Sequence, residues 1–200
     1  DKEWNGTLSV DDGGVLSTYS EGVEVNKEMY DELRGDRESL LEAIGENPHL
    51  LSGASEDIQS DREIVLTAVR KWGNILEYAS ADLRADPLVL LASISRDDDY
   101  SEVGCPFKYA PLDLLADREF IFRAVLENGY VLKHAPQELR ADREVALAAI
   151  TTNDLSFNYV DEDLQTDREF ILQAVTHNGE VLKHLSEELR ADKEIVLAAV

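Results

Sequence analysis

The sequence predicts an all-α fold: an α-solenoid of about six helical-hairpin repeats of 25 residues, followed by a truncated seventh. A motif of Asp, a basic residue and Glu recurs at a near-constant spacing, and an apolar block of helical length follows each copy. A fixed period of about 20 to 50 residues is typical of stacked repeats. We assign the repeat domain to residues 36–200, with units that begin at Asp36, Asp61, Asp86, Asp117, Asp142, Asp167 and Asp192.

Each unit is expected to open with a helix that its first Asp caps, because the carboxylate accepts hydrogen bonds from free N–H groups of the first turn. Pro87 supports this assignment, since proline is favoured at the first helical position. A small residue such as Ala149 recurs in the apolar block and would let helices approach closely. The apolar positions cover more than one stripe, so we expect burial between neighbouring units.

The first helix of a unit is expected to end near an Asn-Gly pair such as Asn128-Gly129, with glycine in the left-handed conformation of a C-cap. A short second helix follows, as at 131–134, and then a capped turn with a core leucine such as Leu139. A leucine-rich repeat has a similar period, but its strand needs Leu-x-Leu alternation, which we do not find.

Residues 1–35 are assigned as an N-terminal extension or a degenerate capping unit. Asp11 lies 25 residues before Asp36, and Leu16 and Tyr19 match apolar helix positions of the first unit, as in a decayed repeat. Turn signals in the same segment favour a small hairpin or a linker equally well. The three alternatives stay open at this point.

The third unit carries six extra residues, at about 98–103, because its Asp lies 31 residues before the next one. Insertions in stacked repeats form loops on one face, often the binding face, although a tolerated surface insertion is the alternative. A calcium-binding EF-hand loop is not favoured, because it would need Gly and a carboxylate where the chain has Glu102 and Lys108. The inserted segment adds four residues to a candidate interaction surface: Asp97, Asp98, Asp99 and Tyr100.

A column of rings supplies the rest of that candidate surface. Five residues share one repeat position: Tyr78, Tyr109, His134, Tyr159 and His184. The column is either a packing element between layers or a ring-lined binding face. The two histidines are two units apart, roughly 20 Å at a helix spacing of about 10 Å, and so cannot share a zinc ion.

Basic residues are placed regularly, which predicts a ladder of ion pairs between units. Arg follows the capping Asp in five units, and further arginines close the turns beside recurring acids. An arginine stripe that grips an anionic ligand is the alternative. The turn arginines are Arg34, Arg84, Arg140 and Arg190, and the acids beside them are Asp57, Asp82, Asp113, Glu138, Asp163 and Glu188.

The composition is that of an acidic globular chain. It has 42 acidic and 19 basic residues, a formal net charge of −23 and 44% hydrophobic residues. A phosphate backbone repels such a chain, so we expect no nucleic-acid binding. No apolar run approaches the roughly 18 residues of a membrane span, so we expect no membrane insertion. The single Cys105 excludes an internal disulfide framework and favours an intracellular location, although the compartment stays open.

Residues 138–150 read Glu-Leu-Arg-Ala-Asp-Arg-Glu-Val-Ala-Leu-Ala-Ala-Ile, a motif that resembles the repeat family called domain of unknown function 4116. The resemblance covers Asp31 to Val200 in seven in-phase copies, and departs from the pattern at Pro87, in the insertion and before residue 31. It implies tandem helical repeats in large proteins and no catalytic residues.

The sequence lacks the motifs of serine hydrolases, nucleotide-binding loops, zinc proteases and dinucleotide enzymes, so we expect no enzyme, no cofactor and no metal site. We expect a non-catalytic protein-interaction or scaffold domain of a larger protein. A structural spacer within a large assembly is one alternative, and a regulatory module of an enzyme or effector encoded elsewhere in the parent chain is another. The negative charge favours basic protein partners.

Position 1 is not Met, and the chain stops at Val200 inside an apolar block, so we expect a fragment of a longer protein. By analogy with earlier units, Val196, Leu197 and Val200 are expected to pack on residues 170–175. The uncovered side of this last helix is then expected to associate end to end or to fray, because stacked repeats need a polar outer face at each end.

Overall fold

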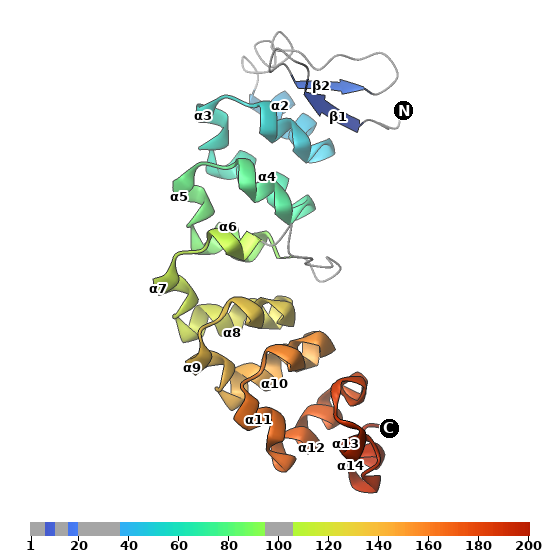
Figure 1. Ribbon diagram of the computed structural model, residues 1–200. Coiled ribbons are helices and arrows are strands. Elements are labelled where there is room, and N and C mark those ends of the chain that lie inside the picture. The colour runs from blue at the N-terminus through green and yellow to red at the C-terminus, as the bar shows by residue number, and fades with distance from the viewer. Residues whose placement is uncertain (1–6, 11–15, 20–36, 95–105) are drawn as a thin grey trace.

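A computed structural model describes residues 7–10, 16–19, 37–94 and 106–200, and over 37–94 and 106–200 it confirms the all-α repeat fold. Two short strands lie apart from the helices, β1 (Thr7–Val10) and β2 (Leu16–Tyr19). They pair antiparallel, with Val10 opposite Leu16 (Figure 1). Leu16 and Tyr19, whose spacing matched a repeat helix, therefore lie in a strand of a small hairpin.

The first helix of each unit begins one residue after the Asp taken as the start of that unit. Five of these opening helices, α2 among them, are ten residues long. The third, α6, is shorter because the chain leaves the helix at Ser93. These helices are α2 (Arg37–Glu46), α4 (Arg62–Lys71), α6 (Pro87–Ala92), α8 (Arg118–Glu127), α10 (Arg143–Thr152), α12 (Arg168–His177) and α14 (Lys193–Ala198).

Two further helical segments complete a unit, so a unit has three segments and not the two of a hairpin. A 3₁₀ helix comes first: η1 (Pro48–Gly53), η2 (Gly73–Tyr78), η3 (Pro106–Tyr109), η4 (Gly129–His134), η5 (Asp154–Tyr159) and η6 (Gly179–His184). The expected closing turn is a short α-helix: α3 (Glu56–Gln59), α5 (Ala81–Arg84), α7 (Leu112–Leu115), α9 (Gln137–Arg140), α11 (Glu162–Thr166) and α13 (Glu187–Arg190).

The predicted aspartate caps are confirmed wherever the structure describes them. Asp142 Oδ1 accepts hydrogen bonds from the backbone nitrogens of Glu144 and Val145, at 3.0 and 3.1 Å. Asp117 accepts one such bond, from Phe120 at 2.8 Å. The remaining described caps bond two backbone nitrogens each, and they are Asp61, Asp86, Asp167 and Asp192. Asp36 lies outside the described residues.

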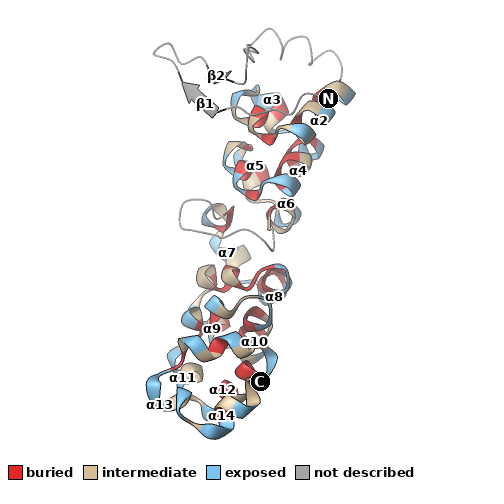
Figure 2. Cartoon of the chain, turned by 90° about the vertical axis from the view of Figure 1, so that its right-hand side faces the viewer, coloured by how far each residue is buried: buried red, intermediate tan, exposed pale blue. Residues whose placement is uncertain are grey.

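The units are stacked so that each packs on the next, opening helix on opening helix and 3₁₀ helix on 3₁₀ helix. The stack bends, and α3, α5, α7, α9 and α11 lie along its outer edge (Figure 1). The opening helices run across the stack from that edge, so their C-terminal ends line the opposite, inner edge. Buried residues follow the middle of the stack and exposed residues cover its outside (Figure 2).

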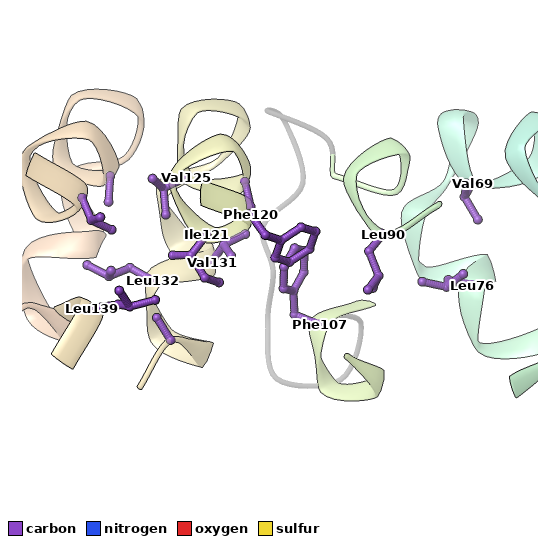
Figure 3. Close-up of a cluster of buried hydrophobic side chains, with 14 of the residues drawn as sticks. Val69, Leu76, Leu90, Phe107, Phe120, Ile121, Val125, Val131, Leu132 and Leu139 are labelled. Carbon is purple, nitrogen blue, oxygen red and sulfur yellow. The ribbon is translucent and has the colours of Figure 1, made fainter. Parts of the chain in front are cut away.

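The hydrophobic core continues through the third and fourth units, where the insertion interrupts the sequence period. The rings of Phe107 and Phe120 lie 5.8 Å apart between centroids. Figure 3 shows them between Leu90 of the third unit and Ile121 and Val131 of the fourth. These five side chains are buried, so the stack has one core in the described residues.

The prediction of left-handed glycine caps is wrong, and the structure gives another reason for these glycines. None of Gly73, Gly129 and Gly179 has a backbone φ in the left-handed region. A Cβ on Gly129 would instead overlap the carbonyl oxygen of Ala149 in the next unit. At three junctions the recurring small residue therefore has glycine as its partner, and the two allow the backbones of successive units to meet.

The last described helix differs from its expected packing. Ile195 is fully buried, whereas Leu197 is 61% and Val200 99% exposed. The expectation that Leu197 and Val200 pack on α12 is wrong, because the face of α14 that meets α12 carries Ile195 instead. End-to-end association through this helix stays a prediction.

Replacing Gly129 by Ala is expected to destabilise the protein by about 1–3 kcal/mol, because overpacking forces the backbone to shift. The new methyl group would also meet Ser156 Oγ. Gly45→Ala is the matched control, since a Cβ there would lie 3.6 Å from a methyl group of Thr67. It should be neutral or stabilising by up to about 1 kcal/mol, as for glycine in a helix. Urea denaturation measures both, and equal effects would contradict the steric role.

Replacing Asp142 by Ala is expected to cost about 1 kcal/mol, the usual cost of a lost helix cap. Asp142→Asn is the control, because the side-chain oxygen that accepts from Glu144 and Val145 is kept while the negative charge is lost. The asparagine variant should therefore lose less stability. Denaturation midpoints at unchanged slope decide the point. Equal losses in the two variants would assign the effect to the charge and not to the cap.

Candidate interaction surface

The five rings predicted to form a column occupy equivalent places in the structure. Each is the last residue of its 3₁₀ helix, η2 to η6, and each is partly buried. A 3₁₀ helix of one unit packs on that of the next, so each ring lies beside the preceding unit. The residues of this aromatic column are Tyr78, Tyr109, His134, Tyr159 and His184.

The tyrosines of the aromatic column contact cations and rings. The guanidinium of Arg84 lies 5.2 Å from the ring centroid of Tyr109, in the distance range of a cation–π contact. Tyr159 meets Tyr130 edge to face at 5.3 Å, and the ammonium of Lys133 lies 5.9 Å from the Tyr159 ring. Burial raises the pKa of Tyr78, and the neighbouring Glu77 adds to the effect.

The histidines of the column differ from one another. His134 stacks on Phe107, with 6.3 Å between ring centroids, and its Nε2 is buried without a hydrogen bond. His184 Nε2 lies 2.8 Å from Asp154 Oδ2 in the preceding unit. Burial alone would raise the pKa of Asp154, but the contacts with His184 and Lys183 outweigh it and lower that pKa.

These contacts join successive units, as a packing column would, while each of the five residues stays partly exposed. A binding role for the aromatic column stays a prediction. Four residues of the candidate surface fall outside the described residues, and so does Cys105. The four are Asp97, Asp98, Asp99 and Tyr100.

The predicted ladder of ion pairs is present, with partners other than the turn acids. The arginine that follows each capping Asp reaches the capping Asp of the next unit. Arg118 lies 2.7 Å from Asp142 and 2.6 Å from Glu144, both in the next unit. Its hydrogen bond is the main reason that the pKa of Asp142 lies below its usual value. The same pairing joins Arg37 to Asp61, Arg62 to Asp86, Arg143 to Asp167 and Arg168 to Asp192.

In two units, a residue near the end of the closing helix bonds backbone carbonyl groups, whereas the sequence predicts that the turn arginines join the ladder of ion pairs. Arg84 donates to the backbone carbonyls of Glu77 and Ala79 at the end of its own 3₁₀ helix. Gln165 does the same for Phe157 and Val160. The sequence interpretation of Arg84 as part of the ladder is therefore wrong, because its guanidinium satisfies free carbonyl groups at a helix end.

Asparagine forms a second ladder that the sequence interpretation missed. Asn128 Oδ1 accepts from the backbone nitrogen of Tyr130 and so caps η4. The amide group of Asn178 reaches back 28 residues to the carbonyl of Ile150, at 2.9 Å. The signal was available, since asparagine recurs at one repeat position, but we read it only as the end of a helix.

Three exposed apolar side chains lie near the C-terminal ends of opening helices. Trp72 follows α4 directly and is 40% exposed, while Leu126 lies in the last turn of α8 and is 43% exposed. Leu155, at the start of η5, is also 43% exposed. We call these three residues the apolar edge, because the ends of the opening helices line the inner edge of the stack. No periodic signal marks them in the sequence.

A polar groove lies on the opposite, outer side of the stack, between the fourth and fifth units. It has a volume of about 520 Å³ and is lined by α9 and by the chain from Asn158 to Gln165. Gln137 donates across it to Asp161 at 3.0 Å. Within the described ranges, no three His, Cys, Asp or Glu side chains are placed to hold a metal ion. None of the described helices has the length and apolar composition to cross a bilayer.

This geometry defines a tandem α-helical repeat protein. The family model for Domain of unknown function (DUF4116) matches residues 36–84, 88–140, 117–165 and 167–200, and the chain belongs to that family. The predicted family resemblance is thereby confirmed. Searches of curated proteins and of solved structures gave no match.

The stability of the protein is expected to fall as the pH drops below about 6.5, in part through His134. Burial lowers the pKa of His134, so the unfolded chain takes up the proton first. The contribution of His134 is therefore present above the unfolded pKa and lost as the pH falls through the folded one. His134→Phe should reduce this pH dependence in urea denaturation. Parallel pH profiles for the variant and the parent would contradict this.

Proposed function

We propose that this chain is a non-catalytic protein-binding repeat domain. The observation that supports the proposal is the apolar edge: Trp72, Leu126 and Leu155 come from three units, lie near the C-terminal ends of α4, α8 and α10, and are exposed on an acidic molecule. Solvent-exposed apolar groups that gather on one face are typical of protein interaction sites, and tryptophan is enriched there. A structural spacer that binds no partner is instead expected to have a polar surface there.

The proposed partner is a basic protein. The net charge of −23 favours fast association with positively charged surfaces and disfavours nucleic acids. An inner edge that spans several units offers an extended surface to one partner, as stacked repeats commonly do. The single cysteine supports an intracellular site of action, where thiols stay reduced.

Affinity capture with the apolar edge changed tests this function. Trp72→Ser, Leu126→Ser and Leu155→Ser together should abolish capture of proteins that the parent chain enriches from extract. The control is Leu112→Ser with Leu197→Ser, which removes apolar side chains that are 84% and 61% exposed and lie outside the apolar edge. The control should keep the captured proteins. Thermal unfolding confirms that each variant is folded.

Enrichment of no protein over empty beads, or equal loss in both variants, would contradict the binding function. The first outcome favours a structural spacer, and the second indicates adhesion through apolar surface in general. Capture of an enzyme from the same parent protein would favour the regulatory alternative.

A further inference from the structure

A recurring arginine site lies at the junctions between units. In four of the described junctions one guanidinium contacts two carboxylates of the next unit, the capping Asp and the Glu two residues later. Arg168, for example, lies 3.1 Å from Asp192 and 2.7 Å from Glu194. The other three sites join Arg37 to Asp61 and Glu63, Arg118 to Asp142 and Glu144, and Arg143 to Asp167 and Glu169.

The junction between the third and fourth units has the carboxylates of this site without its arginine. Asp117 and Glu119 occupy the two acidic positions at the start of α8, and α8 packs on α6. In α6, Pro87 occupies the position from which arginine supplies the guanidinium at the other junctions. Among the described contacts of Asp117, the only hydrogen bond is the one from the backbone of Phe120. No basic side chain of the described residues pairs with Asp117 or Glu119.

Exposure distinguishes this junction from the others. Asp117 is exposed, whereas the other described capping aspartates are partly covered. Leu88 stands where all six of the other opening helices carry the second acid, and it is 56% exposed. The first turns of α6 and α8, which pack on each other, thus carry two exposed carboxylates and one exposed apolar side chain, where the other opening helices carry an acid in place of the apolar residue.

We propose that Asp117 and Glu119 bind an arginine side chain of the partner protein, with Leu88 in contact with an apolar residue next to that arginine. We infer an arginine ligand because the equivalent Asp and Glu hold a guanidinium at four other junctions. Arginine fits better than lysine, since its planar fork can bond two carboxylates at once. The proposal rests on the protein-binding function. It gives the partner a second point of contact, at the N-terminal ends of the opening helices, besides the apolar edge at their C-terminal ends.

The probe is the peptide acetyl-Ala-Leu-Arg-Leu-Ala-amide, added to the ¹⁵N-labelled chain at about 0.15 M salt to screen general charge attraction. Amide signals of Leu88 and of residues 117–120 should shift, while those of 142–145 should not. Replacing the peptide's arginine by citrulline, which keeps the shape and removes the charge, should weaken binding at least about fivefold.

Asp117→Asn with Glu119→Gln should weaken the peptide by a similar factor, and asparagine still caps α8. The matched control is Asp142→Asn with Glu144→Gln, which removes the same charge at a site already held by Arg118 and should change affinity less than about twofold. Pro87→Arg restores the chain's own arginine, as in five other units, and should block the peptide.

Absence of binding, shifts spread over all acidic junctions, or equal weakening by the two double variants would overturn the proposal. Peptide binding at Trp72 in place of Leu88 would also overturn it, while leaving the protein-binding function intact. If the Asp117 and Glu119 variant does not fold, Pro87→Arg decides alone, since unchanged affinity in that variant is incompatible with the proposed site.

Discussion

A capping aspartate serves two units at once. In Asp142, Oδ1 accepts the amide hydrogens of its own helix, and Oδ2 accepts a hydrogen bond from Arg118, one unit earlier. One carboxylate thus determines where a helix begins and how that helix is positioned on its neighbour. The rest of the stack depends on this alignment, because a 25-residue unit cannot bury its apolar face alone. The glycine of one unit then reaches the backbone of the next.

The two ends of the opening helices give the stack two chemically different edges. Charged side chains concentrate at the N-terminal ends, where carboxylates and guanidinium groups alternate from unit to unit. At the C-terminal ends asparagine amides cap the 3₁₀ helices, and exposed apolar side chains such as Trp72 and Leu155 lie beside them. A partner that approached the inner edge would therefore meet apolar contacts set in an overall negative field.

Periodic features of this fold were predictable from the sequence, and features that depend on a neighbour were not. The caps at Asp61 and Asp142 follow from local chemistry, so their spacing was enough to place every described opening helix. The role of Gly129 was missed, because it depends on the carbonyl of Ala149 twenty residues away in the chain. The exposure of Trp72 was missed for a related reason: whether a side chain is covered depends on the shape of the adjoining unit.

The pairing of glycine with alanine bears on how a chain of this kind can change its length. The second, fourth and sixth units each supply a glycine that meets a small residue of the unit after it, as Gly129 meets Ala149. A duplicated unit of this kind would bring both the glycine and the small residue with it, so a gene could gain or lose such units with this contact preserved. A duplication of another length would move the glycine out of register with the small residue of the next unit. Chains of this kind are therefore expected to differ in length by whole repeats.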